Sequence, residues 1–188
     1  MVRSDGELLL AHLRGDRYAF AELVDRHAGV LWTVALRTLR DERDAAEVVQ
    51  DALVRAHQHA ADYRGEATVR GWLVRIVVNA CRDRYRRAGS RPVEVRDELA
   101  LLRVPAPRDP IADHDLRMDL RDALGALPLE QRMVVVLVTM LGYPTEEVAD
   151  MLGIAVGTVK SRGARARAVL AEALADRAPA PRMAGGDR

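Results

Sequence analysis

Several residue types that mark common protein classes are scarce in this chain of 188 residues. Aromatic residues make up only 4% of it, and the abundant Ala, Leu, Val and Arg favour helices over sheets. A single cysteine, Cys81, excludes an internal disulfide and is typical of a reducing compartment. The longest apolar run, 133–141, is too short to cross a bilayer, and the polar start predicts no signal peptide. We therefore expect a soluble, cytoplasmic, all-helical protein without membrane insertion.

A strong charge imbalance and the common signatures of catalysis are also missing. The formal net charge is only +1, so any affinity for nucleic acid must come from local patches. We find no glycine-rich phosphate loop, no Ser-His-Asp order and no carboxylate pair with a plausible cleft, and we expect neither an enzyme nor a cofactor. His57 and His59 would point to different faces of one helix, so no metal site is predicted. Cys81 is interpreted as a small, partly buried hydrophobe.

The segment 143–162 has the spacing of a helix-turn-helix. Gly153 supplies the tight turn, where a positive φ costs nothing, and Pro144 suits the first position of the first helix. The second helix has no carboxylate nearby, since none occurs from residue 151 to residue 171, and its cations are Lys160, Arg162, Arg165 and Arg167. A basic amphipathic helix on any α-hairpin would show part of this pattern. The turn glycine, the small Ala149 and the segregated charge together favour DNA binding in a major groove.

Helical periodicity and breaks divide the chain into two small helical domains joined by a flexible linker. Residues 1–90 predict four helices, with the third over 44–59 and a break at 63–67 centred on Gly65. Residues 91–112 are rich in proline and acidic side chains and predict an extended linker. Residues 113–177 predict four more helices, including one from Pro128 to Gly142 and the helix-turn-helix. Residues 178–188 predict a disordered tail.

In this order the residues resemble the extracytoplasmic-function sigma factors of bacterial RNA polymerase. The resemblance covers most of the chain, and four motifs in the right order around a linker make it specific. They are Gly15-Asp-Arg-Tyr-Ala-Phe-Ala-Glu-Leu23, Asp44-Ala-Ala-Glu-Val-Val-Gln-Asp51, Tyr63-Arg-Gly-Glu66 with Gly71-Trp-Leu-Val-Arg-Ile-Val-Val-Asn-Ala80, and Leu127-Pro-Leu-Glu-Gln-Arg132 with Val156-Gly-Thr-Val-Lys-Ser-Arg162. The segments 75–81 and 161–167 lean towards the sigma-M type of actinobacteria.

The resemblance implies that residues 1–90 are a region 2 domain, which binds core polymerase and reads the −10 promoter element as a single strand. Bases that leave the stack need flat side chains and cations for their phosphates, and residues 62–87 contain seven arginines against three carboxylates. The loop would cradle one flipped base, Asn79 would bond a base edge, and arginines would hold the backbone. Trp72 also suits a core position beside Ile76, which its spacing favours. The implied −10 residues are Tyr63, Arg64, Gly65, Glu66, Trp72, Arg75, Asn79, Arg82 and Arg86.

The resemblance makes residues 113–177 a region 4 domain that reads the −35 element as duplex DNA. On the second helix, Lys160, Ser161 and Arg165 would reach bases or phosphates, whereas Arg162 and Arg167 would contact phosphates or flank the core. Thr158 completes this implied −35 set. Gly163 stands where the family commonly has a larger apolar residue, and we expect it to leave that packing position empty.

Core polymerase would bind one face of the third predicted helix, formed by Glu47, Gln50, Asp51 and Arg55. Spacing alone favours an ordinary solvated face in which Asp51 and Arg55 form an ion pair, and only the resemblance favours docking on the coiled coil of the largest polymerase subunit. The resemblance also implies an anti-sigma factor as a regulatory partner. The alternatives are a stand-alone helix-turn-helix regulator of transcription and a helical adaptor that binds only proteins.

Overall fold

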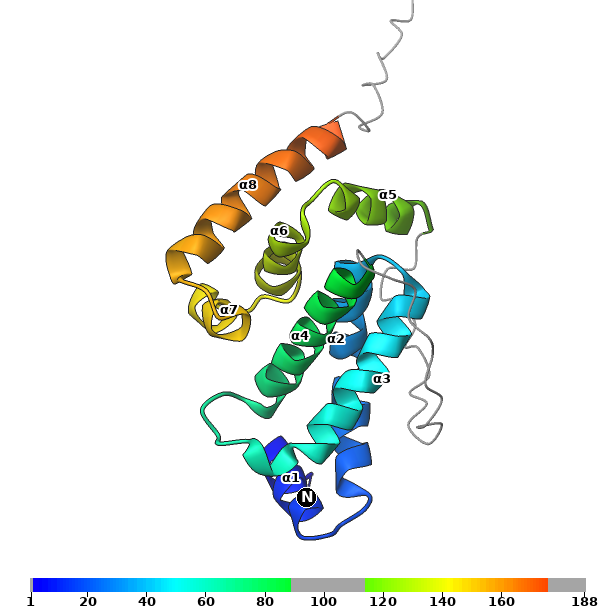
Figure 1. Ribbon diagram of the computed structural model, residues 1–188, viewed down its shortest axis with the longest axis vertical. Coiled ribbons are helices and arrows are strands. Elements are labelled where there is room, and N and C mark those ends of the chain that lie inside the picture. Colours follow the sequence, from blue (N-terminus) through cyan, green and yellow to red (C-terminus); the bar gives the residue numbers. More distant parts are fainter. Residues whose placement is uncertain (1, 89–113, 176–188) are drawn as a thin grey trace, which may run out of the picture.

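The computed structural model describes residues 2–88 and 114–175, and all of their regular structure is helical (Figure 1). The predicted linker 91–112 and tail 178–188 lie outside the described residues. The elements in chain order are α1 (Asp5–Leu13), α2 (Ala19–Leu39), α3 (Glu42–Gln58), the 3₁₀ segment η1 (Ala60–Asp62), α4 (Val69–Ala88), α5 (His114–Gly125), α6 (Leu129–Val134), the π-helical segment η3 (Val135–Met140), α7 (Thr145–Leu152) and α8 (Val156–Ala175).

Short polar signals in the sequence set the ends of the first helices. Ser4 caps α1 in a reciprocal capping box: its Oγ accepts from the Glu7 N–H at 3.2 Å, and Glu7 Oε2 accepts from the Ser4 N–H at 2.6 Å. Asp41 caps α3 by accepting from the Asp44 N–H at 2.9 Å, so α3 begins earlier than predicted. Arg40, at φ 66°, ends α2 in the left-handed conformation.

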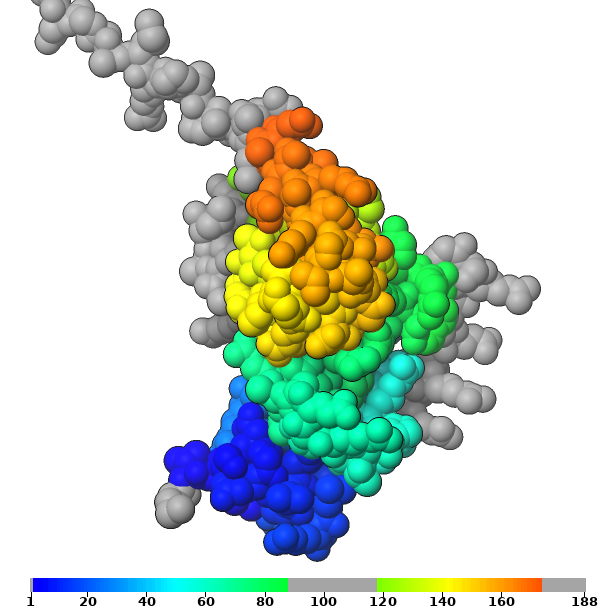
Figure 2. Space-filling view, turned by 90° about the vertical axis from the view of Figure 1, so that its left-hand side faces the viewer, coloured from blue at the N-terminus to red at the C-terminus, as the bar shows by residue number. Residues whose placement is uncertain are grey.

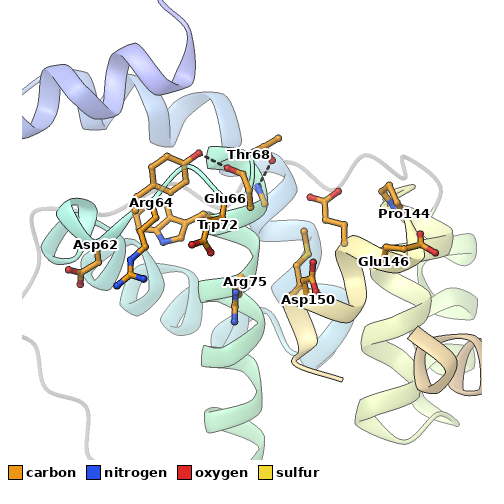
Figure 3. A pocket seen from close by; sticks show the side chains of 14 residues that line it. Asp62, Arg64, Glu66, Thr68, Trp72, Arg75, Pro144, Glu146 and Asp150 are labelled. Carbon is orange, nitrogen blue, oxygen red and sulfur yellow. Dashed lines mark hydrogen bonds between the residues drawn. The ribbon is translucent and has the colours of Figure 1, made fainter. Parts of the chain in front are cut away.

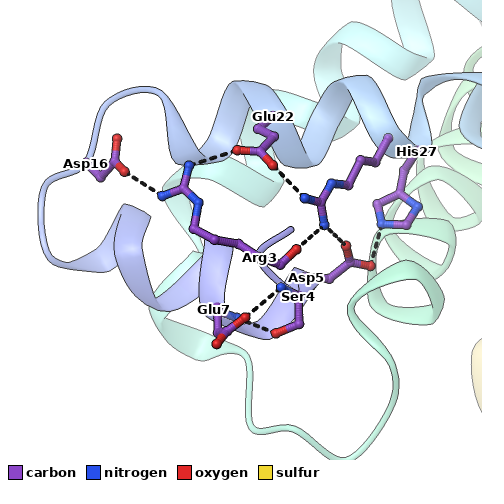
Figure 4. Close-up of polar contacts among 8 residues, drawn as sticks. Arg3, Ser4, Asp5, Glu7, Asp16, Glu22 and His27 are labelled. Carbon is purple, nitrogen blue, oxygen red and sulfur yellow. Dashed lines mark hydrogen bonds and ion pairs between the residues drawn. The ribbon is translucent and has the colours of Figure 1, made fainter. Parts of the chain in front are cut away.

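A chain of ion pairs fastens the start of the chain to α2 (Figure 4). Arg3 contacts Asp16 at 2.9 Å and Glu22 at 2.8 Å, and Arg26 contacts Glu22 at 2.5 Å and Asp5 at 3.2 Å. These side chains are partly exposed, so each pair contributes little to stability. These ion pairs hold α1 in its orientation, and the buried leucines of α1 supply the apolar contact with α2.

The first four α-helices pack around one apolar core, as predicted. The positions at helical spacing in α2 are buried, among them Phe20, Leu23 and Leu31. Cys81 of α4 is fully buried rather than partly buried, because α4 is covered on this side by its neighbours. Burial raises the pKa of the Cys81 thiol to about 12, so the thiol stays protonated near neutral pH.

The second helical unit, α5 to α8, packs directly against the first. A single cluster of buried side chains runs from Leu73 and Val77 of α4 to Met133, Leu137 and Val148 of the second unit. Figure 2 shows α7 and α8, coloured yellow to orange, packed against the green surface of α4. The two units therefore share a continuous core in this arrangement.

Residues 135–140 form a π-helical segment where a continuous α-helix up to Gly142 was predicted. The Leu141 N–H donates to Val136 O at 3.1 Å, five residues back. Every residue from Met133 to Leu137 is buried, because this stretch lies between the first unit on one side and α5 and α8 on the other. Gly142, at φ 71°, ends the segment as predicted.

Candidate nucleic-acid interface

The helix-turn-helix formed by α7 and α8 follows its sequence pattern closely. Gly153 adopts φ 63°, and the next residue, Ile154, donates its N–H to Ala149 O at 3.0 Å. Val148 and Val159 are buried between the two helices. The predicted position of Pro144 is off by one residue, because its extended backbone (ψ 144°) places it just before the first residue of α7.

The outer face of α8 carries the side chains predicted to read the −35 element. Lys160 and Arg165 are exposed, and Arg167 is exposed at the edge of the same helix. Thr158 and Ser161 are half-buried, and the Ser161 Oγ donates to Thr158 O at 3.1 Å. The exposed side of α8 is therefore the side that carries its cations.

The expectation that Gly163 leaves a packing position empty is wrong. Gly163 is buried, and a Cβ added there would lie 3.5 Å from Val134 Cγ1 and 3.3 Å from Arg167 Nη1. Val134 and the folded-back arginine fill the space that a larger side chain would take.

The loop between η1 and α4 is an ordered turn that ends in a helix cap. Gly65 has φ 76°, as expected for the centre of the break. The Tyr63 hydroxyl donates to Ala67 O at 2.5 Å, and Thr68 Oγ1 accepts from the Gly71 N–H at 3.0 Å. These bonds hold the loop in shape while leaving residues 64–68 exposed.

A cavity of about 500 Å³ opens between this loop and α7 (Figure 3). Arg64, Trp72 and Arg75 line the side formed by the first unit, and Glu146 and Asp150 line the side formed by α7. The Tyr63 and Trp72 rings lie 5.5 Å apart between their centroids. Trp72 is half-buried: it packs against the core, as its spacing favours, and also lines the cavity.

Side chains of α7 lie directly over Gly71 of α4. Gly71 is buried, and a Cβ there would lie 2.9 Å from Glu147 Oε1. The acidic first turn of α7 thus covers the cavity from the second unit. One wall of the cavity beside the predicted −10 loop is therefore formed by α7, which the sequence analysis placed in the other domain.

Further along α4, the predicted −10 residues have different surroundings. Asn79 and Arg86 are both exposed, and Arg86 forms an ion pair with Asp83 at 2.5 Å. Arg82 is half-buried and occupied: Nη1 donates to Leu152 O at 3.0 Å, and Nη2 lies 3.2 Å from Glu130 Oε2. This arginine contacts the second unit instead of facing open solvent.

The predicted polymerase face of α3 is a mixed surface. Asp51 and Arg55 are exposed, but Arg55 pairs with Asp83 of α4 at 3.7 Å rather than with Asp51 as spacing suggested. Glu47 and Gln50 are half-buried, and Glu47 Oε2 lies 3.1 Å from Arg84 Nη1. The tertiary partner on α4 has replaced the local ion pair.

Two residues that bridge the units were not singled out in the sequence as site residues. Glu130 contacts Arg82 and also Arg162, whose Nη1 lies 2.7 Å from the same Oε2 atom. Arg132 is buried and donates to Thr38 O of α2. Both belong to the motif 127–132, but their partners lie far away in sequence, so no local pattern indicates these contacts.

Neither a metal site nor a membrane segment is found in the part of the chain that the structure describes. Within residues 2–88 and 114–175, no group of three or more His, Cys, Asp or Glu side chains could hold a metal ion. No helix in the same ranges is long and apolar enough to span a bilayer.

Both helical units match known protein families. Residues 23–91 match the family model of Sigma-70 region 2, and residues 117–170 match that of Sigma-70 region 4. The chain is 47% identical over 176 residues to the ECF RNA polymerase sigma factor SigM of Mycobacterium tuberculosis strain H37Rv, covering 92% of this chain and 85% of that one. The chain belongs to the extracytoplasmic-function sigma factors. A sigma factor of this family is a transcription initiation factor that binds core RNA polymerase and directs it to promoters.

Solved structures place the sigma factor's fold in the same family. CnrH, solved in complex with the cytosolic domain of CnrY, is 31% identical with a TM-score of 0.69, covering 93% of this chain and 99% of that one. RpoE of Bartonella quintana, solved with the anti-sigma factor NepR, is 26% identical with a TM-score of 0.68, covering 84% and 98%. The identity with SigM also agrees with the predicted leaning towards the sigma-M type.

Proposed function

We propose that this sigma factor reads a promoter with two surfaces: the 63–68 loop with α4 for a single-stranded −10 element, and the outer face of α8 for a −35 duplex. The observation that carries the proposal is the pairing of these surfaces in one chain. One is a cavity edged by Trp72, Arg64 and Arg75, and the other is a helix face with Lys160 and Arg165 exposed. The first suits an unstacked base and the second suits a major groove.

The cavity has the size and walls that base capture requires. About 500 Å³ is within the range of small-molecule sites and accommodates a nucleobase. Tyr63 and Trp72 offer ring surface, and stacking of one base on an aromatic ring contributes about 1–3 kcal/mol. The exposed guanidinium of Arg75 is placed for backbone phosphates, and the exposed amide of Asn79 for a base edge. Arg82 and Arg86 would add phosphate contacts.

On α8, Arg165, Lys160 and Ser161 would make the base and phosphate contacts of the −35 element. No carboxylate occurs in the chain from residue 151 to residue 171, so the exposed cations of this stretch meet a phosphate with little repulsion from their own helix. Arg162 and Arg167, at the edges of the helix, would contact flanking phosphates, and Thr158 lies in the first turn of α8. Phosphate contacts position the helix, and base contacts supply the sequence preference.

Core polymerase would bind the face of α3 that holds Glu47, Gln50, Asp51 and Arg55. The ion pairs of Glu47 with Arg84 and of Arg55 with Asp83 fix these side chains, so less side-chain entropy is lost on binding. The protein acts where polymerase acts, in the cytoplasm, and has no catalytic activity of its own. An anti-sigma factor would control it, as the structural relatives with bound partners suggest.

A binding experiment with matched variants tests the assignment of the two surfaces. Promoter fragments are first selected from a random DNA library by the wild-type holoenzyme. Holoenzymes with Arg165→Ala, Asn79→Ala or the control Arg121→Ala, an exposed arginine of α5, are then titrated with two probes. One is the −35 duplex, and the other has an unpaired −10 strand.

We expect Arg165→Ala to weaken binding of the −35 duplex by about 1–3 kcal/mol, roughly 5- to 150-fold. Asn79→Ala should weaken only the probe with the unpaired −10 strand, and Arg121→Ala should change neither. Equal losses on both probes, or losses no larger than that of the control, would contradict the assignment. Protection of duplex DNA by the chain without polymerase would favour a stand-alone regulator.

A further inference from the structure

One carboxylate, that of Glu130, lies between two arginines that the proposed function directs to DNA. Glu130 Oε2 is 3.2 Å from Arg82 Nη2 of α4 and 2.7 Å from Arg162 Nη1 of α8. Glu130 is in the first turn of α6, so the three side chains come from both helical units. A single acidic oxygen thus accepts hydrogen bonds from two arginines, as a phosphate oxygen can.

The surroundings of Glu130 show that this contact belongs to the closed arrangement of the two units. Arg82 Nη1 also donates to Leu152 O at the carboxyl end of α7, where the helix dipole attracts a cation. A groove of about 690 Å³ lies beside the contact and is lined by Asn79 and Arg86, which the proposed function also assigns to the −10 element.

The burial of the three side chains sets the character of this contact. Arg82 and Arg162 are 21% and 25% exposed, and Glu130 is 40% exposed. The two guanidinium groups are therefore partly shielded from water and held by the carboxylate. The carboxylate is more exposed, so a phosphate can compete with it for the arginines. A phosphate that approaches must displace Glu130 before either guanidinium can bind it.

We propose that Glu130 occupies the place of DNA phosphates within this chain, keeping both arginines occupied and adding an ion pair to the contact between the two units until DNA replaces it. The proposal rests on the proposed function, because that function assigns Arg82 to the −10 element and Arg162 to the −35 element. It adds a coupling between the two surfaces. Only the contact with Arg82 crosses between the units, because Glu130 and Arg162 both belong to the second unit. A phosphate that binds Arg162 must displace the carboxylate that also holds Arg82, so it weakens this crossing contact.

The coupling extends to the cavity of the 63–68 loop. In the closed arrangement its acidic wall is α7, which is held in part by the bond from Arg82 to Leu152 O. Release of Arg82 removes this bond and loosens the end of α7, which widens the entrance to the cavity for a strand of DNA. Duplex binding by α8 therefore favours access to the −10 loop.

The test uses the full chain with Glu130→Gln, which keeps the shape of the side chain and removes its charge. Glu172→Gln is the matched control, because Glu172 is an exposed carboxylate of α8 and its loss changes the net charge equally. Labels on Gln58→Cys and Ala171→Cys, both at exposed positions, report the distance between the units. The native Cys81 stays unlabelled because it is buried.

We expect Glu130→Gln to shift the label distances to longer values than Glu172→Gln does. We also expect it to bind the −35 duplex about three- to tenfold tighter than the control, the factor expected for freeing arginines from partly exposed ion pairs. A purely structural role would not increase DNA affinity. In a protein that already carries Arg82→Gln, the change Glu130→Gln should lengthen the label distances less than it does in the wild-type background. Arg82→Gln has already removed one of the two contacts of the Glu130 carboxylate.

Label distances or duplex affinity equal to those of Glu172→Gln would overturn the proposal. The wild-type chain is assayed with core polymerase on the same promoter in parallel. A normal promoter-specific transcript together with no effect of Glu130→Gln would refute the inference and leave the proposed function intact. A failure of the wild-type chain to give any transcript would refute the proposed function, while the distance shift would still report on the Glu130 contact.

Discussion

Replacing Arg132 with methionine is the most informative single change for stability. Arg132 is 6% exposed, and its guanidinium donates to three backbone carbonyls: Leu124 O at 2.8 Å, Leu127 O at 2.8 Å and Thr38 O at 2.6 Å. Two of these bonds close the turn between α5 and α6, and the third crosses to α2 in the first unit. Among residues 2–88 and 114–175 no carboxylate pairs with Arg132, and burial lowers the pKa of Arg132 from its ordinary value.

The size of the effect follows from these bonds and from the cost of burying the charge. A hydrogen bond from a charged donor contributes about 1.5–3 kcal/mol, so three bonds give a gross loss of about 4–9 kcal/mol. Removing the buried charge recovers part of the free energy that its desolvation costs, and water can bind some of the carbonyls left without a donor. We therefore expect Arg132→Met to lower the free energy of unfolding by about 2–4 kcal/mol.

Urea denaturation followed by circular dichroism measures this loss in the full chain. Arg121→Met is the control, because this arginine of α5 is exposed and should cost less than about 0.5 kcal/mol. Arg132→Lys should recover only part of the loss, since a single ammonium cannot reach all three carbonyls in the same geometry. If Arg132→Met and Arg121→Met shift the midpoint equally, the carbonyl network contributes no net stability and the reasoning is refuted.

Three further predictions follow from single sites. Gly163→Ala should raise the free energy of unfolding by up to about 1 kcal/mol in urea denaturation, because the helix gains alanine's propensity and the flexible Arg167 can move aside; a loss would show that the contact cannot relax. Cys81 should resist a thiol reagent at pH 7.5 and react only after denaturation, since burial holds its pKa at about 12; fast native labelling would contradict this. Burial and the nearby His12 hold the pKa of His57 below its ordinary value, so the unfolded chain binds the proton first and stability falls as the pH drops below about 6.5. The loss between pH 7.5 and 5.5 should be smaller in His57→Gln, and an unchanged loss would count against this cause.

The local signals in the sequence predicted most of the helices because they act over a few residues. Gly65, Gly142 and Gly153 all adopt the positive φ that the breaks required. Ser4 caps α1 through hydrogen bonds that reach only to Glu7. Some helix ends differ from the predicted ones by a residue or two, where the sequence holds a capping residue that the prediction did not use. Asp41 is such a residue for α3.

Long-range partners were beyond the reach of the sequence patterns. The predicted pair of Asp51 with Arg55 gave way to Arg55 with Asp83, because α4 offers a carboxylate that one-helix spacing cannot show. Arg82 was expected to face DNA, yet it contacts Glu130, 48 residues away. Such contacts depend on how the two units dock, which no local period specifies.

The space around Gly163 could not be predicted for a related reason. Helical periodicity shows that this position faces the core, but not how closely the neighbouring helix approaches. In the structure the side chains of Val134 and Arg167 fill this position. At Gly71, too, the neighbouring atoms belong to side chains, among them Glu147 Oε1 of α7.

In vitro transcription is the most direct test of the account as a whole. Core RNA polymerase is incubated with a library of genomic fragments, with and without the full chain, and transcripts are mapped at their starts. We predict discrete transcripts that require the chain and that are lost or strongly reduced with Asn79→Ala and Arg165→Ala together. The same transcripts from core polymerase alone, or none with the chain present, would contradict the account.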